Sequence, residues 1–348
     1  MLLTKNLHYD ITSCKEAAKT HIIVISFLLI KNEKLKKRGD TNTMNKYFIK
    51  KALFSFLTLI IVVTLVFFML RAIPGGPFTR EKPLPAATRE RLEAAYGLNE
   101  PLFTQYLIYM GNVFSGDLGP SFRNPGYTVN DLLKTGIPQT ARIGFFAVIV
   151  IIFLGIPLGV ISALKSNTSI DYGVMILATI GITVPSFVIG SLFILLAQNT
   201  SWIPVGGLDK PISYLGPVVA LSGYSLAFVS RLTRSSMLEV LRQDYIRTAR
   251  ANGLSEYKVI FKHALKNSLI PVVTYIGPMI AALMTGSFVV EKIFVINGIG
   301  KYFTESIGSR DYTLVIGVTI FYAVFYIFMV LLVDLAYSYI DPRIRFSK

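Results

Sequence analysis

Long apolar stretches recur along the chain, and each is bounded by segments that carry charge. Six of them contain no Asp, Glu, Lys or Arg and approach or exceed the roughly 20 residues that a helix needs to cross a bilayer; they are residues 52–70, 143–164, 172–197, 211–230, 268–290 and 312–333. Backbone polar groups inside a bilayer must be satisfied within the segment itself, which favours helices. The pattern predicts an all-α polytopic membrane protein with six transmembrane helices.

The basic residues lie in the short segments between these stretches, and mostly on one side of the predicted bundle. Residues 44–51 carry Lys46, Lys50 and Lys51, residues 231–267 carry the largest group, and the tail at 341–348 is also basic. Six helices place these three segments on the same side. Because cytoplasmic segments carry the excess of Lys and Arg, we expect that side, and both termini, to be cytoplasmic. Residues 231–267 are called the basic segment below.

Composition agrees with a membrane protein and argues against other classes. The chain of 348 residues is 53% hydrophobic and only 16% charged, with a mean hydropathy of +0.56. Its net charge of +15 is spread between apolar stretches, which argues against nucleic acid as a partner. One cysteine, Cys14, and three scattered histidines suggest neither a disulfide framework nor a metal site.

The pattern divides the chain into consecutive parts. Residues 1–43 contain an apolar run too short to span a bilayer and no cleavage-site pattern. We expect them to be a non-native or disordered extension, because Met44 begins a typical cytoplasmic flank. The parts that follow are 44–71, the flank and first transmembrane helix; 72–139, an extracytoplasmic insertion; 140–340, the transmembrane core; and 341–348, a cytoplasmic tail.

Two short helices are predicted in the insertion. Thr88 is a candidate cap for the first, which should end at Gly97. The second should run from Pro101 to about Gly116, with an apolar face of Leu102, Phe103, Tyr106, Leu107, Met110, Val113 and Phe114. Packing of this face on the insertion itself or on the membrane surface is the favoured interpretation, and direct contact with a ligand is the alternative.

The basic segment is predicted to form two amphipathic helices separated by Gly253. The first should place on one face Leu238, Leu241, Tyr245, Ile246 and Ala249. Ser255 is a candidate cap for the second, whose apolar face should hold Tyr257, Ile260, Phe261, Ala264 and Leu265. Such an element either covers the ends of the protein's own helices or docks into a partner, and the pattern alone favours neither.

Known catalytic motifs are not found. Residues 298–301 (GIGK) resemble the end of a phosphate-binding loop, but the required Gly five residues before the Gly-Lys pair is Val295, and Tyr302 follows the lysine. There is no metalloprotease or α/β-hydrolase motif. We therefore expect no catalytic residues, no bound metal and no cofactor held by this chain.

The predicted helices contain prolines and glycines that permit bending, together with a few polar residues. We predict a polar pathway lined by Pro185, Ser186, Ser222, Tyr224, Tyr275, Thr285 and Ser287. For any one of the polar side chains among them, hydrogen bonding between helices is the alternative role.

Several stretches together resemble one family. Residues 244–256 (DYIRTARANGLSE) and 263–271 (HALKNSLIP) are similar to the cytoplasmic EAA loop of ABC importer permeases in the peptide/nickel family. Further similar stretches are 70–77 (LRAIPGGP), 96–101 (YGLNEP), 116–119 (GDLG), 184–187 (VPSF), 297–303 (NGIGKYF) and 309–312 (SRDY). The resemblance covers nearly all of residues 44–348 and is closest to B-type membrane subunits of oligopeptide or dipeptide permeases.

The resemblance implies a type I ABC importer permease fold and a transport subunit without its own ATPase site. It implies a multi-pass protein of the bacterial cytoplasmic membrane that imports oligopeptides or dipeptides by alternating access. The implied partners are a second homologous permease subunit, two cytoplasmic ATPase subunits that use ATP, and an extracellular peptide-binding protein. The binding protein is expected at the insertion and at a loop over residues 297–311.

Contact with the ATPase is implied for residues around the glycine of the EAA loop. They are Arg247, Ala249, Arg250, Gly253, Leu254, Tyr257 and Ile260. The sequence departs from the wider family where Arg247, Thr248 and Ala249 replace Glu-Ala-Ala, while the glycine is kept as Gly253. A sharp turn between two helices also gives Gly253 a physical reason, since such turns often need positive φ.

Other functions remain as alternatives. Within the same family, nickel, glutathione or another small solute is an alternative cargo. An ion-coupled secondary transporter is more distant, because it should show inverted repeats and ionisable residues at mid-membrane, and neither is evident. A structural or insertase-like membrane protein would leave the paired amphipathic helices around Gly253 without a role.

Overall fold

The computed structural model of the chain describes residues 41–340, except residues 75, 79–89, 92, 95, 125 and 201. The chain divides into two units, residues 1–54 with 334–348 and residues 55–333. The described part of the first unit consists of the opening turns of one helix and the closing turns of another. The second unit contains the other described elements. The predicted extension, residues 1–43, and the tail, residues 341–348, lie almost wholly outside the described residues.

The described residues form helices and no strand, apart from one isolated β-bridge between Pro120 and Thr128. In chain order the larger elements are α2 (Thr41–Ala72), α4 (Leu102–Phe114), α5 (Val129–Val150), the π-helix η1 (Ile151–Gly155), α6 (Ile156–Leu164), α7 (Ser169–Thr183), α8 (Ser186–Ala197), the 3₁₀ helix η2 (Pro211–Tyr214), α9 (Leu215–Leu241), α13 (Ile270–Met284), α14 (Phe288–Ile293), α15 (Ile299–Ser309) and α16 (Tyr312–Ile340). The all-α prediction is confirmed.

The predicted membrane spans correspond to helices of sufficient length and apolar character. Five single spans are found among the described residues: Ile49–Ala72, Val129–Leu164, Pro211–Leu241, Ile270–Ile293 and Tyr312–Leu332. Together α7 and α8 make a sixth candidate, but they are bent by 105°. The third predicted span is therefore broken near its middle. Pro185 explains the break, since it disfavours helical geometry at the preceding residue, and Val184 is accordingly extended, with ψ 121°.

The second and fourth spans are longer than the sequence pattern suggested. Helix α5 begins at Val129, where Thr128 and Asp131 form a capping box, so the end of the predicted insertion is helical. With η1 and α6 it makes a rod of 36 residues, which at 1.5 Å per residue is about 54 Å long. This exceeds a bilayer core of about 30 Å. Helix α9 likewise continues beyond Ser230 to Leu241.

The insertion contains the second predicted helix, α4, with Pro101 at its N-cap. Its packing face agrees with the prediction in part. Tyr106, Met110 and Val113 pack with α2 and α16 as predicted, together with Tyr109. The other four predicted face residues are at least half exposed, namely Leu102, Phe103, Leu107 and Phe114. A periodic pattern does not reveal which edge of a broad apolar face meets a neighbour. Thr88, the proposed cap of the first helix, lies outside the described residues.

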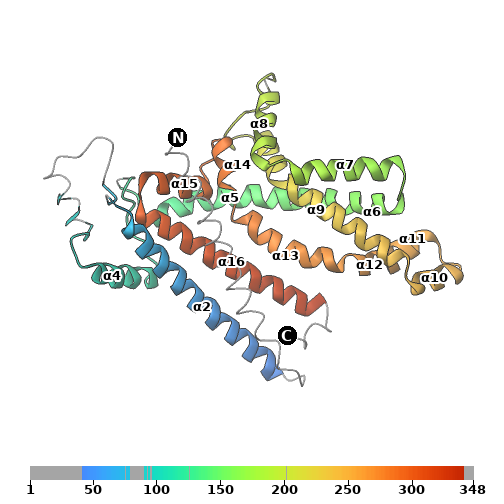
Figure 1. Cartoon of the computed structure of the whole chain (residues 1–348), viewed down its shortest axis with the longest axis horizontal. Coiled ribbons are helices and arrows are strands. Elements are labelled where there is room, and N and C mark those ends of the chain that lie inside the picture. Colours follow the sequence, from blue (N-terminus) through green and yellow to red (C-terminus); the bar gives the residue numbers. More distant parts are fainter. Residues whose placement is uncertain are drawn as a thin grey trace, which may run out of the picture. The chain divides into compact units, whose positions relative to one another are not determined.

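Helix α9 is the central element of the core, and it packs against α5, α6, α7, α8 and α13 (Figure 1). Small residues permit the closest approaches. A Cβ on Gly159 of α6 would collide with the backbone of Ser230 and the side chain of Thr233, both on α9. A Cβ on Gly181 of α7 would press on Ala227. The backbones of α6, α7 and α9 are therefore closely packed, as small residues allow in membrane bundles.

A buried carboxylate organises the start of α15. Glu291 is 2% exposed and accepts hydrogen bonds from Thr140 Oγ1 (2.9 Å) and from the backbone N–H of Lys301 (3.1 Å). Thr140 Oγ1 in turn accepts from the backbone N–H of Ile299 (2.9 Å). These bonds satisfy backbone donors that a helix N-terminus leaves free. The segment 297–311, expected to be a loop, is thus a helix fixed to α5.

Candidate functional site

The basic segment lies at one end of the bundle, called the basic end below. After α9 ends at Leu241, the chain forms α10 (Asp244–Ala251), a turn, α11 (Glu256–Lys258), the π-helix η3 (Val259–Ala264) and α12 (Leu265–Ser268). Helix α13 follows directly at Ile270. The segment therefore connects two core helices, so that a force applied to it acts on both.

The turn between α10 and α11 depends on Gly253. Its φ is +76°, a left-handed value that other residues adopt at a cost, and its N–H donates to the Arg250 carbonyl (3.0 Å). A Cβ at this position would have no atom within 4 Å, so the glycine is required by conformation and not by space. An ion pair between Arg250 Nε and Glu256 Oε1 (2.8 Å) spans the turn. The predicted role of Gly253 in a sharp turn is confirmed.

One face of the basic segment packs on the protein itself. Beyond α9, its buried residues are Ile246, Ala249, Val259 and Ala264, which form a cluster with Ala163 of α6 and Met237 of α9. Ile246, Val259 and Ala264 are 0% exposed. The segment is therefore fixed firmly to the ends of α6 and α9.

The opposite face of the segment is exposed and partly apolar. Leu254 is 36% exposed, Tyr257 70% and Phe261 52%, and the rings of the last two lie 4.6 Å apart between centroids. The preceding helix α10 adds exposed charged groups, including Arg247, whose side chain is 74% exposed. Clustered apolar side chains with a polar rim are typical of a surface that binds another protein. The inner face thus fits the first alternative from the sequence, while docking of the outer face on a partner stays a prediction.

Some details of the predicted segment are wrong. Leu238 and Leu241 belong to α9, because the chain first leaves helical geometry at Gln243. Ser255 occupies the N-cap position of α11 but makes no capping hydrogen bond through its side chain. Tyr257 was expected on the inner face, but it is 70% exposed, and Val259 is buried there instead. The π-helix explains this difference, since its wider turn rotates the side chains away from 3.6-residue spacing.

The residues assigned to ATPase contact are divided between the two faces. Ala249 lies in the internal cluster, and Ile260 is half-buried against it. The other assigned residues, namely Arg247, Arg250, Gly253, Leu254 and Tyr257, are exposed. Phe261 was not predicted as a contact. It follows Tyr257 by four residues, and residues at this spacing are neighbours on a helix surface, so the sequence could have indicated it.

The predicted pathway residues are spread over several environments. Ser222 is buried and bonds within its own helix, and Ser287 caps α14 by accepting from the N–H of Val290 (3.4 Å). Pro185 and Ser186 lie at the bend between α7 and α8.

Other predicted pathway residues lie beside aromatic rings or a pocket. Tyr224 is exposed and stacks beside Phe228, which also contacts Tyr275 at 4.3 Å between centroids. Thr285 lines a pocket of about 430 Å³ that Phe303, Tyr322 and others complete. No described pocket contains all seven residues, so a shared pathway stays a prediction.

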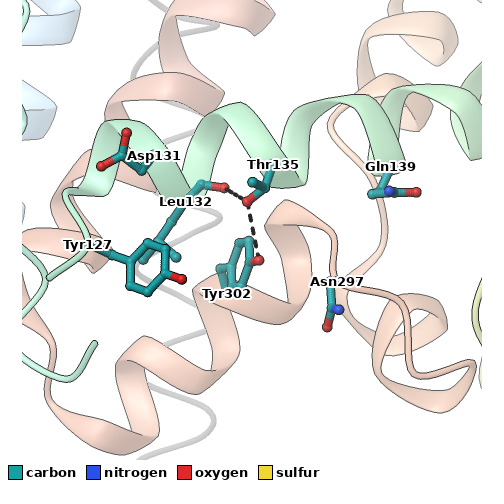
Figure 2. Close-up of a pocket in the computed structure, with 7 residues that line it drawn as sticks. All are labelled: Tyr127, Asp131, Leu132, Thr135, Gln139, Asn297 and Tyr302. Carbon is teal, nitrogen blue, oxygen red and sulfur yellow. Dashed lines mark hydrogen bonds between the residues drawn. The ribbon is translucent and has the colours of Figure 1, made fainter. Parts of the chain in front are cut away.

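A second pocket lies at the end of α5 opposite the basic end, and it is called the α5–α15 pocket below. It has a volume of about 400 Å³ and is lined by Tyr127, Asp131, Leu132, Thr135, Gln139, Asn297 and Tyr302. Figure 2 shows four of these residues along α5, with Tyr302 on α15 facing Thr135. The Oε1 of Gln139 is buried and has no hydrogen-bond partner. Its lining joins the two segments that were expected to meet a binding protein.

Comparison with known families covers most of the chain. Residues 155–346 match the family described as "Binding-protein-dependent transport system inner membrane component". Residues 44–129 match the family described as the N-terminal part of such membrane components. These two matches together contain the basic segment, α9 and most of the insertion.

Individual relatives are similar over nearly their whole length. The chain is 45% identical to the dipeptide transport system permease protein DppB of Bacillus subtilis over 306 residues, which are 88% of this chain and 99% of that protein. It is 42% identical to the oligopeptide transport system permease protein OppB of Salmonella typhimurium, over 87% of this chain and 100% of that protein.

A solved structure supports the fold. A chain of the MetNI methionine ABC transporter, in an inward-facing conformation, matches with a TM-score of 0.51 at 17% identity, over 60% of this chain and 96% of that one. At this identity the likeness shows the fold alone. Together with the family matches, it shows that this chain is a multi-pass membrane protein with an ABC importer permease fold, and that it belongs to the family of inner membrane components of binding-protein-dependent transport systems.

Proposed function

We propose that the chain is the permease subunit of an ATP-driven importer of oligopeptides or dipeptides. The cargo is inferred from relatives at 42–45% identity, which carry the names of dipeptide and oligopeptide permeases. Nickel, glutathione or another small solute is the alternative cargo within the family. Growth of a deletion strain on peptides of defined length tests the cargo: growth that is unaffected on every peptide would exclude it.

The observation that carries the proposal is the two-faced basic segment. Its inner face is fixed to α6 and α9, and its outer face exposes Leu254, Tyr257 and Phe261. An ATPase subunit that bound the outer face would displace the inner face and the helices attached to it. The chain itself would hydrolyse no ATP, since residues 298–301 lack the residues of a phosphate-binding loop. Alternating access would then arise from rigid movement of packed helices.

The remaining partners follow from the arrangement of the two ends. A second permease subunit would complete the pathway, and two ATPase subunits would bind at the basic end, which we place in the cytoplasm with both termini. An extracytoplasmic peptide-binding protein would dock at the other end. The α5–α15 pocket is the feature that supports this site, because polar groups of the insertion and of α15 meet there.

Site-specific cross-linking tests the docking of the ATPase. Cys14 is the only cysteine, so Cys14→Ser gives a background for single introduced cysteines. Tyr257→Cys should cross-link to a nucleotide-hydrolysing subunit in native membranes. Ile307→Cys is the matched control, because Ile307 is 52% exposed on α15 at the other end. Equal cross-linking from both positions, or none from Tyr257→Cys, would contradict the proposal.

A further inference from the structure

A buried ion pair at the basic end has no role in the function described so far. Asp171 lies in the first turn of α7, and its side chain is only 2% exposed. Its two oxygens accept from Arg234 of α9 in a bidentate arrangement, with Nε–Oδ1 and Nη2–Oδ2 both at 2.6 Å. Bidentate pairs of this kind fix orientation as well as distance. The pair therefore holds α7 and α9 in one relative position.

The same carboxylate also reaches a third segment. Ser162 Oγ on α6 donates to Asp171 Oδ1 (2.5 Å), and the backbone N–H of Asn167 donates to Oδ2 (2.9 Å). Asn167 lies in the turn between α6 and α7, with a left-handed φ of +63°. The carboxylate thus binds α6, α7, the turn between them and α9 at once. We call this set of four residues the Asp171 joint.

The joint adjoins the cluster that fixes the basic segment. Ser162 directly precedes Ala163, and Arg234 lies one helical turn before Met237. Ala163 and Met237 are the two core residues against which Ile246, Ala249, Val259 and Ala264 pack. A displacement of residues 242–267 would therefore reach α6 and α9 within one turn of the joint.

Stability alone is a weak reason for such a pair. Apolar residues of similar volume often replace a buried ion pair without loss of stability, because removing the charges from water is costly. The geometry gives a different reason. Without the joint, α7 and α9 would be held at this end by apolar contacts, which permit sliding, and by the exposed bond from Arg231 to Thr179. A bidentate arginine does not permit such sliding.

We propose that Asp171 and Arg234 are positioning residues that make α6, α7 and α9 move as one body when an ATPase displaces the basic segment. The inference rests on the proposed function, since it needs an ATPase at the basic end. In this role the joint transfers motion from the basic segment to α7. From α7 the motion passes through the bend at Pro185 toward α8.

The test is the coupling ratio, which is the number of peptides imported per ATP hydrolysed by the assembled complex in proteoliposomes. Two variants remove the ion pair: Asp171→Asn, and the apolar double variant Asp171→Leu with Arg234→Met. Each should lower the coupling ratio about fivefold or more, since about fivefold is the lower end of typical coupling between two sites. ATP hydrolysis should stay within about twofold of wild type, on the same scale. The exchanged pair Asp171→Arg with Arg234→Asp should restore part of the ratio.

Arg231→Met is the matched control. Arg231 lies on the same helix and also bonds to α7, but through an exposed contact from its Nη2 to Thr179 Oγ1 (2.9 Å). Its removal should leave the coupling ratio unchanged.

Two results would overturn the inference. The first is a wild-type coupling ratio in the apolar pair. The second is failure of every joint variant to assemble, since the joint would then serve only the fold. The proposed function fails separately, if wild-type complexes import peptide without ATPase subunits.

Discussion

Removal of the two exposed rings of the basic segment, by Tyr257→Ala with Phe261→Ala, is expected to detach the ATPase and abolish uptake. Full burial of one large apolar side chain is worth about 1.5–3 kcal/mol. Scaled by the exposed fractions of 70% and 52%, the two rings offer roughly 2–4 kcal/mol to a partner that covers them. At 1.4 kcal/mol per tenfold change, the dissociation constant should rise from about thirtyfold to several hundredfold.

The chain itself should be almost unaffected by this change. Both rings lie on the surface, where a substitution usually alters stability by less than about 0.5 kcal/mol. A useful contrast is Ile246→Ala. Ile246 is 0% exposed in the cluster with Ala163 and Met237, and the cavity left by its side chain should cost about 2–5 kcal/mol of folding free energy. The double variant should thus insert normally, while the Ile246 variant should lose thermal stability.

The measurement is co-purification of ATPase subunits with the tagged chain, together with peptide uptake by the same cells. Ile307→Ala, which removes an exposed side chain at the other end of the bundle, is the control and should co-purify with the ATPase subunits as the wild type does. If the double variant bound the ATPase as tightly as the wild type, the exposed face would not be the docking surface and the reasoning would be refuted.

Three further predictions concern single positions. Gly253→Asp should abolish uptake at an unchanged membrane level, because it places a negatively charged side chain on an exposed turn whose left-handed backbone favours glycine; normal uptake would contradict this. Gly159→Val should reduce the amount of folded protein, because a side chain there collides with α9. Gly173→Val is the control and should be tolerated, since its side chain meets open space. Fluorescence-detected size exclusion measures both. Glu291→Leu should lower the unfolding temperature, because the Thr140 hydroxyl and the N-terminus of α15 lose their acceptor at a cost of about 1–3 kcal/mol; an unchanged temperature would show that the carboxylate is dispensable.

The sequence predicted the transmembrane helices well, because the length of an apolar run directly reports the capacity to span a bilayer. It predicted their ends poorly. The charge-free stretch begins after Arg142, yet a charged residue is tolerated within a helix that extends beyond the bilayer. The helix starts at Val129, where Thr128 and Asp131 form a capping box that local sequence can indicate.

Features that depend on contacts between distant segments were not predictable. Arg234 counted only as one of several basic residues, because nothing in its local sequence shows that Asp171 lies beside it. Glu291 ended a predicted span without a role, although it fixes the start of α15. In the basic segment, the alternation of buried and exposed residues followed a π-helix, a geometry that 3.6-residue spacing does not anticipate.

Reconstitution into proteoliposomes tests the central claim most directly. Import of a labelled peptide would be measured for the membrane subunits alone, with added ATPase subunits, and with ATPase subunits and ATP. We predict import only in the last case. Import by the membrane subunits alone, without ATPase or ATP, would contradict the account.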